Sequence, residues 1–315
     1  MMDKRCQMSE DELKAILDEI ENELTGDPDH DIDVLDAWGE RYRGNPDAEP
    51  LMREISNRIF EIMINEDPDE PQQIFENMVE TADEDYEEAC QLINEKRYDE
   101  AETKLAVLTE VIKAYPLSDD AVWTDFTSYL EGMIFQDYFS EGIGDREVRR
   151  HPMHPGPILY TYGSLLIEMG KAEEALYPLK MLDDLNPVCM KYIFELGEAY
   201  KRTGQMEEAF NNALWGLSCA SKRAELARCY RDMAFCLSEA GNFNDAVMLY
   251  MLSLHYQPSR QADTEIAWIR KKSGVSSDGY NLDAIKERCK EVGIPVGISE
   301  TVQRNMDLLD SLGKS

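Results

Sequence analysis

The sequence predicts an all-α, right-handed helical-repeat solenoid, and two observations support this fold class. The first is a phrase that recurs three times: a small residue, a glycine seven residues later, and an alanine five residues after that. The second is that apolar residues recur at helical spacing along most of the chain. The three copies, with periods of 34 and 37 residues, are Gly163, Gly170 and Ala175; Gly197, Gly204 and Ala209; and Ala234, Gly241 and Ala246. Periods in this range indicate stacked pairs of helices.

Each residue of the phrase has a steric reason. The small residue of the first helix and the alanine of the second lie where two antiparallel helices cross, and a larger side chain would push them apart. The glycine ends the first helix, because a left-handed backbone conformation is easiest without a Cβ atom. Pro187 and Pro258 close the second helix of the first and third units, since proline cannot continue a helix.

The segments just before the clear repeats are less regular. A diverged first copy is expected over 82–115, where Lys96 takes the place of the turn glycine. An aromatic helix follows, from Trp123 to Tyr138; it is apolar nearly all round and is therefore expected to be buried. The Gly- and Pro-rich stretch 141–157 is expected to join two lobes.

Helices are also predicted near the N-terminus. Ser9 and Glu12 form a capping box before the first one. Further helices are expected over 34–42 and 50–64, with a short one over 74–79.

Beyond the repeats, helices over 263–272, 282–291 and 299–312 are expected to cap the solenoid, and Ser299 is predicted to be the N-cap of the last. The predicted organisation therefore has five parts. They are an acidic N-terminal helical region (1–80), diverged repeat-like helices (81–140), the joint (141–157), three repeats (158–260) and C-terminal capping helices (261–315).

The repeated pattern resembles the tetratricopeptide repeat (TPR) family, since about eight positions recur in register in three copies over 156–260. The order of segments also resembles a group of bacterial TPR proteins with no assigned activity, down to a Cys-Lys-Glu-Val-Gly-Ile-Pro-Val-Gly segment at 289–297. The family resemblance implies a scaffold that binds a protein or peptide in a concave groove. It also implies that positions two, five, nine, twelve and thirteen of each unit's first helix line that groove.

Carried over, the groove positions are Pro157, Tyr160, Ser164, Ile167 and Glu168 in the first unit, Lys191, Phe194, Glu198, Lys201 and Arg202 in the second, and Arg228, Arg231, Phe235, Ser238 and Glu239 in the third. The set lacks the asparagines of the clamp with which some chaperone-binding members hold an Asp-terminated tail. Cations outnumber anions in it, so one hypothesis is an acidic, extended or C-terminal peptide held by Lys and Arg and anchored on aromatic rings. The alternative is that the cations pair with neighbouring acids and the aromatic rings pack in the core. The predicted binding residues are Tyr160, Lys191, Phe194, Lys201, Arg202, Arg228, Arg231 and Phe235.

The net charge of −32 is unevenly placed. Residues 1–150 hold 42 Asp and Glu against 14 Lys and Arg, whereas residues 151–315 hold 22 against 18. The acidic half should repel nucleic acid and anionic membranes. Two further hypotheses follow: the acidic region folds onto the groove of its own chain or of a second copy, as autoinhibition or self-association, or it mimics DNA and sequesters a basic protein.

Other function classes have little support in the sequence. No apolar run reaches the ~18 residues of a membrane span, and the N-terminus does not resemble a secretory signal. Seven cysteines without a C-x-x-C pair favour reduced thiols in the cytoplasm. His151 and His154 are expected in a solvated loop, and the run from Asp27 to Asp33 lacks the turn glycine of a calcium loop. Phosphate-binding, nucleophile and zinc motifs are missing, so we expect no catalysis, cofactor or metal, and a protein or peptide as partner.

Overall fold

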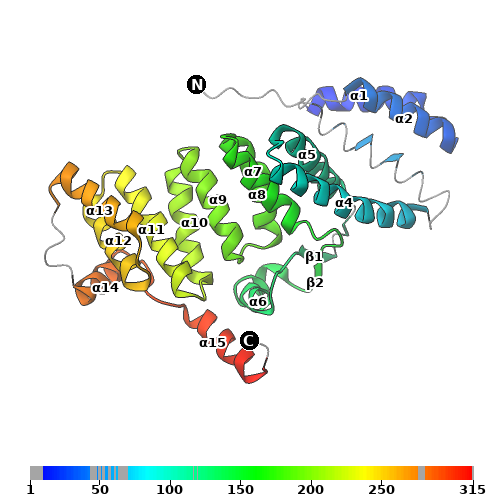
Figure 1. Cartoon of the computed structure of the whole chain (residues 1–315). Helices are drawn as coiled ribbons and strands as arrows, with labels where there is room; N and C mark the ends of the chain where they lie inside the picture. Colours follow the sequence, from blue (N-terminus) through cyan, green and yellow to red (C-terminus); the bar gives the residue numbers. More distant parts are fainter. Residues whose placement is uncertain are drawn as a thin grey trace. The chain divides into compact units, whose positions relative to one another are not determined.

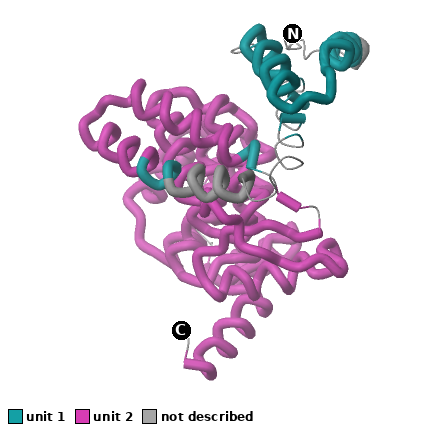
Figure 2. Tube along the Cα trace, turned by 90° about the vertical axis from the view of Figure 1, so that its right-hand side faces the viewer, with its two compact units in different colours: residues 1–84, 113–115 teal, residues 85–112, 116–315 magenta. Residues whose placement is uncertain are grey.

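The computed structural model describes residues 10–42, 48, 51, 54–55, 58–59, 62, 70–115, 117–118, 120–275 and 281–313. The capping box predicted at Ser9 lies outside the described residues, as does most of the helix predicted over 50–64. The chain forms two compact units, residues 1–84 with 113–115 and residues 85–112 with 116–315 (Figure 2). The segment 141–157, expected to join two lobes, lies within the second unit.

The first unit contains helices α1 (Glu10–Glu23) and α2 (Pro28–Tyr42). Helix α2 begins earlier than the expected residue 34, because proline suits the first turn of a helix. The carboxylate of Asp31 accepts hydrogen bonds from the backbone N–H groups of Thr25 at 2.7 Å and Gly26 at 2.8 Å, which fixes the turn before the helix. The hydrophobic core cluster of this unit is formed by Ile20, Leu35, Trp38, Leu51 and Ile55.

Helix α4 (Glu70–Asn94) is longer than predicted. The short helix expected over 74–79 is part of it, and the first helix of the diverged repeat is its C-terminal portion. No glycine or proline occurs between residues 72 and 94, so nothing in the sequence interrupts the helix.

The second unit consists mainly of helix pairs stacked in sequence order (Figure 1). Each helix from α7 (Gly156–Glu168) to α12 (Phe243–Tyr256) packs against its neighbours along the chain, which confirms the predicted all-α helical-repeat solenoid. Helix α4 is joined to α5 (Tyr98–Ala114) by Lys104, whose ammonium group lies 3.0 Å from Asp85 and 2.9 Å from Glu88. The pairs are α4 with α5, α7 with α8 (Ala172–Leu185), α9 (Met190–Arg202) with α10 (Met206–Cys219), and α11 (Arg223–Glu239) with α12.

The turn between the two helices is the same in all four pairs. Gly170, Gly204 and Gly241 have φ angles of 79°, 76° and 80°, and Lys96 adopts the same left-handed conformation at 62°. The two helices of a pair also approach each other closely where they cross: a Cβ atom on Gly163 would lie 2.5 Å from Leu179. The repeated phrase therefore marks the turn and the crossing point of each pair.

The segment between α5 and α7 differs from its prediction. Instead of one buried helix from Trp123 to Tyr138, it contains strand β1 (Ala121–Thr124), helix α6 (Tyr129–Ile143) and strand β2 (Glu147–Arg150). The two strands pair in parallel. The β-branched and aromatic residues of β1 suit a strand, and Ser128 starts α6 by accepting a hydrogen bond from the backbone N–H of Glu131. Tyr129, expected to be buried, is 72% exposed.

The C-terminal helices are α13 (Arg260–Ser273), α14 (Leu282–Glu291) and α15 (Glu300–Ser311). Helices α13 and α14 pack on α12, whereas α15 packs on α6 and α10. Ser299 caps α15 as predicted, since its side chain accepts a hydrogen bond from the backbone N–H of Val302. Asn305 then joins α15 to α6 through a 2.7 Å hydrogen bond to Asp137.

Among the helices described, none has both the length and the apolar composition that crossing a membrane requires.

Candidate functional site

Of the eight predicted binding residues, Phe194 packs against the hydrophobic core of the second unit. The other seven line two pockets, and α9 and α11 contribute to both. The first, here named the cationic pocket, has a volume of about 500 Å³. Its lining residues are Glu198, Lys201, Arg202, Arg228, Arg231, Asp232, Phe235, Tyr250 and Gln261. Five of the eight predicted binding residues are among them, so residues from two separate repeats meet at one site.

Two carboxylates neutralise part of the positive charge in the cationic pocket. The ammonium group of Lys201 lies 2.8 Å from Asp232 and 2.9 Å from Glu198, and Arg202 donates to Glu198 at 2.8 Å. Burial opposes the charge of Lys201, but its two ion pairs prevail and raise its pKa. The alternative expectation, in which groove cations pair with neighbouring acids, therefore holds for Lys201 and Arg202, and also for Arg228, whose Nε atom lies 3.7 Å from Asp232.

Arg231 is different. It is half-buried, and burial lowers the pKa of its guanidinium. Within the described part of the chain, its Nη1 atom is buried and has no hydrogen-bond partner. A buried donor without an acceptor costs roughly 1–3 kcal/mol, and an arginine side chain stays protonated in proteins. Arg231 also lines the cationic pocket, so an anionic ligand bound there would lie beside its guanidinium charge.

A repeated cation–aromatic contact runs along the first helices of the units. The Nζ atom of Lys191 lies 3.6 Å from the ring centroid of Tyr160, and the guanidinium carbon of Arg228 lies 4.2 Å from that of Phe194. In each case the cation is at position two of one unit and the ring at position five of the unit before it. Arg231 is at position five of the third unit, where the two preceding units have these rings.

The second pocket, here named the apolar pocket, has a volume of about 840 Å³. The predicted groove residues Pro157, Tyr160 and Lys191 line it, but the parts of its wall that α6 and α15 contribute were not predicted. Its other lining residues are Tyr86, Thr127, Ser128, Tyr129, Leu130, Glu131, Ile134, Thr161, Val188, Cys189, Met190, Tyr192, Cys219, Ser221, Lys222, Glu225, Met306, Leu309 and Asp310.

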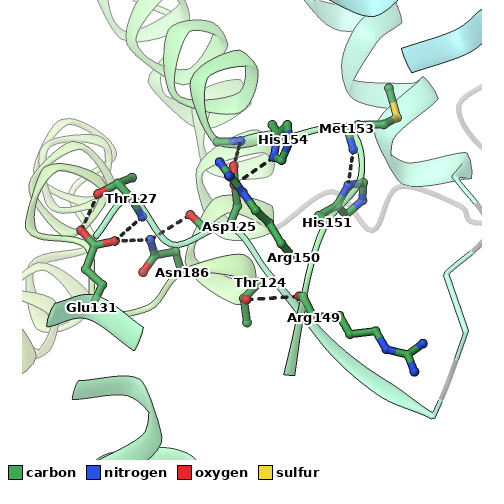
Figure 3. A network of polar contacts seen from close by, with 11 residues as sticks. Thr124, Asp125, Thr127, Glu131, Arg149, Arg150, His151, Met153, His154 and Asn186 are labelled. Carbon is green, nitrogen blue, oxygen red and sulfur yellow. Dashed lines mark hydrogen bonds and ion pairs between the residues drawn. The ribbon is translucent and has the colours of Figure 1, made fainter. Parts of the chain in front are cut away.

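A polar network holds the α6 wall of the apolar pocket in place (Figure 3). Asn186, which is fully buried, donates to the backbone oxygen of Asp125 at 3.1 Å and to Glu131 at 2.9 Å. Glu131 also accepts from the backbone N–H and the hydroxyl of Thr127, each at 2.7 Å. The carboxylate of Asp125 accepts from the backbone N–H of Gly156, at the start of α7, at 2.7 Å. The network therefore fastens α6 to two helices of the solenoid.

One histidine of the His151/His154 pair is not where the sequence placed it. His154 is exposed as expected, but His151 is only 1% exposed, and its Nδ1 atom accepts a hydrogen bond from the backbone N–H of Met153. Burial lowers the pKa of His151 to about 4. The expectation of two solvated histidines was therefore wrong for His151, since the strand β2 that precedes it directs the loop inward.

Across the residues that the structure describes, no three His, Cys, Asp or Glu side chains are grouped so that they could hold a metal ion.

Some lining residues of the cationic pocket had a signal in the sequence. Asp232 follows Arg228 by four residues, so the two share one helix face, and this spacing could have identified it. Tyr250 and Gln261 come from α12 and α13, outside the first-helix positions that the resemblance supplied. Comparison with known proteins adds no assignment, because neither a family model nor a curated protein matches this chain.

Proposed function

We propose that this chain is a TPR-type binding scaffold whose first helices hold an acidic segment of another protein. The observation that supports the proposal most directly is the composition of the cationic pocket, where four cations face two carboxylates. The excess is notable in a chain whose net charge is −32. An Asp or Glu side chain, or a terminal carboxylate, would complete this pocket.

The geometry favours a carboxylate ligand of a protein over a diffuse polyanion. The guanidinium of Arg231 could donate two parallel hydrogen bonds to one carboxylate, which is the strongest pairing available to it. Phe235 and Tyr250 supply apolar surface beside it. A binding surface of this kind requires no turnover, so we propose a binding function in the cytoplasm, where the free cysteines fit a reducing environment.

Affinity capture with charge-reversed variants tests the proposal. The full-length chain and its Arg228→Glu/Arg231→Glu variant are immobilised, native lysate is passed over them, and the bound proteins are identified by mass. Arg270→Glu is the matched control, since Arg270 is exposed on α13 and outside both pockets. We expect the same proteins on the wild type and on the control, and their loss from the double variant.

The capture also separates this proposal from the two hypotheses based on the acidic N-terminal region. If that region binds a basic partner, for instance as a DNA mimic, reversal at Arg228 and Arg231 leaves capture intact, and the pocket proposal fails. If the region instead occupies the cationic pocket in cis or in a second copy, the reversal increases capture or changes the oligomeric state in size-exclusion chromatography.

A further inference from the structure

The cationic and apolar pockets share two helices, and this fixes the distance between them. On α9, Lys191 and Tyr192 line the apolar pocket, and Glu198, Lys201 and Arg202 line the cationic pocket. Both linings thus occur on one helix, with the apolar pocket at its N-terminal end.

Helix α11 has the same order. Lys222 and Glu225, at its start, line the apolar pocket, whereas Arg228, Arg231 and Phe235 line the cationic pocket further along. Two neighbouring first helices therefore lead from one pocket to the other in the same direction.

The rise per residue of an α-helix gives the distance between the two pockets. On α9 and α11 the centres of the two linings are about eight or nine residues apart, which at about 1.5 Å per residue is about 12–14 Å. A chain in extended conformation covers that distance in about four residues, at about 3.3–3.4 Å each. One short extended segment can reach both pockets.

The two pockets select different side chains. In the apolar pocket the carboxylates are largely satisfied: Glu131 accepts from Thr127 and Asn186, and Glu225 accepts from the backbone N–H groups of Ser221 at 2.9 Å and Lys222 at 3.0 Å. Apart from Lys191, Lys222 and Asp310, the remaining wall is mostly aliphatic and aromatic, which suits a large apolar side chain. The cationic pocket has the excess of positive charge already described.

We infer that the partner segment is an extended chain with one large apolar residue and one Asp or Glu about four positions apart. The apolar residue enters the apolar pocket, and the carboxylate pairs with Arg231. The inference rests on the proposed function, because it assumes that the cationic pocket binds an acidic group, and it adds a second anchor with a defined spacing.

The test uses peptides of random sequence, each about a dozen residues long, displayed on phage and selected on the full-length chain. Selected peptides are expected to carry an acidic residue and a large apolar residue three to five positions apart. Synthetic versions in which the spacing is reduced to one or raised to eight should bind at least about tenfold more weakly, measured by fluorescence anisotropy.

Two variants assign the anchors to the pockets. Arg231→Glu should abolish binding of the selected peptides. Tyr129→Glu should weaken the binding of these peptides about tenfold, because Tyr129 lines the apolar pocket. The variant should still fold, since Tyr129 is 72% exposed and glutamate is favourable in the first turn of a helix. Trp268→Glu is the matched control: Trp268 is also an exposed aromatic residue, but it lines neither pocket.

The outcomes distinguish this inference from the proposed function. If Arg231→Glu abolishes binding while neither Tyr129→Glu nor the spacing matters, the inference fails and the proposed function stands. If selected peptides are apolar alone and bind Arg231→Glu as well as the wild type, the apolar pocket takes a different ligand, and both proposals fail.

Discussion

The regular helix pairs and the inserted β1–α6–β2 segment are stabilised in opposite ways. In the pairs, small residues and left-handed turns let apolar faces meet: Ala175, Ala209 and Ala246 are each at most 1% exposed at the crossing points. In the insert, buried polar groups bond to atoms far away in sequence: Asp125 accepts hydrogen bonds from the backbone N–H of Gly156 and, at its backbone oxygen, from Asn186 at the end of α8. The first mode produces a period in the sequence, and the second does not.

The two pockets depend on these two kinds of packing to different degrees. The charged wall of the cationic pocket comes from α9, α11 and their neighbours, so its geometry depends on regular packing. The apolar pocket takes one wall from α6 and another from α15, so it also depends on the polar network of the insert. Changes in the insert should therefore affect the apolar pocket first.

The largest expected effect is that of Asp125→Ala. Its carboxylate, which is 5% exposed, accepts from the backbone N–H of Gly156, and the guanidinium of Arg150 lies 3.4 Å away. Removing it leaves a buried donor unsatisfied at the start of α7, so we expect a loss of about 3 kcal/mol in the free energy of unfolding, measured in urea. Asp145→Ala, at an exposed position in the same segment, should change the stability little. Equal losses would mean that the network does not stabilise the insert.

The next effect is a pH dependence that originates at His151. Its pKa is about 4 in the folded chain and about 6.5 when unfolded, because burial disfavours the charged form. The unfolded chain therefore binds more protons below pH 6.5, and stability falls as the pH drops from there towards 4. Between pH 7 and pH 5 we expect a loss of about 2 kcal/mol from this group.

His151→Asn provides the control for this pH dependence. The asparagine side chain can still accept the hydrogen bond from the Met153 N–H but does not titrate. Urea unfolding of both proteins at several pH values isolates the difference, since other groups titrate in both. A wild-type curve parallel to that of His151→Asn over this window would contradict the assignment.

Features that depend on residues close together in the chain could be predicted from the sequence. Helix pairs, turns and the register of the groove follow from a repeated phrase, and Ser299 follows from cap chemistry, because each depends on residues close together in the chain. The apolar pocket could not be predicted, because α15 meets α6 through Asn305 and Asp137, 168 residues apart. Buried His151 was missed for the same reason, since its surroundings depend on how β2 pairs with β1.

A smaller effect is expected when one glycine of the helix pairs and one glycine of the insert are each replaced by alanine. In Gly163→Ala the new Cβ atom would lie 2.5 Å from Leu179, a side chain that is itself 1% exposed. Overpacking should outweigh the better helix propensity of alanine and cost about 1–2 kcal/mol net. In Gly142→Ala, near the end of α6, nothing lies within 4 Å of the new atom, so we expect a gain of about 0.5 kcal/mol. Urea unfolding should show opposite signs, and a loss at both positions would remove the contrast.

The smallest effect is a stabilisation at Lys96. This lysine adopts the left-handed conformation, at φ 62°, that Gly170, Gly204 and Gly241 adopt in the other pairs. The same backbone hydrogen bonds form there as after α7: the N–H of Arg97 donates to Leu92, and that of Lys171 donates to Leu166. The turn is thus imposed by the packing of the pair, and lysine retains the steric cost of a Cβ atom in this conformation.

Lys96→Gly should therefore raise the free energy of unfolding by about 0.5–1 kcal/mol, since relief of the left-handed strain exceeds the entropy that glycine adds to the unfolded chain. Lys96→Ala keeps the Cβ atom and should change the stability much less, which separates backbone strain from the loss of the exposed ammonium group. Equal gains from the two variants would show that charge, in a segment rich in acidic residues, determines the stability of this turn. A gain confined to glycine would show that the first pair follows the same backbone rule as the other three, despite its diverged sequence.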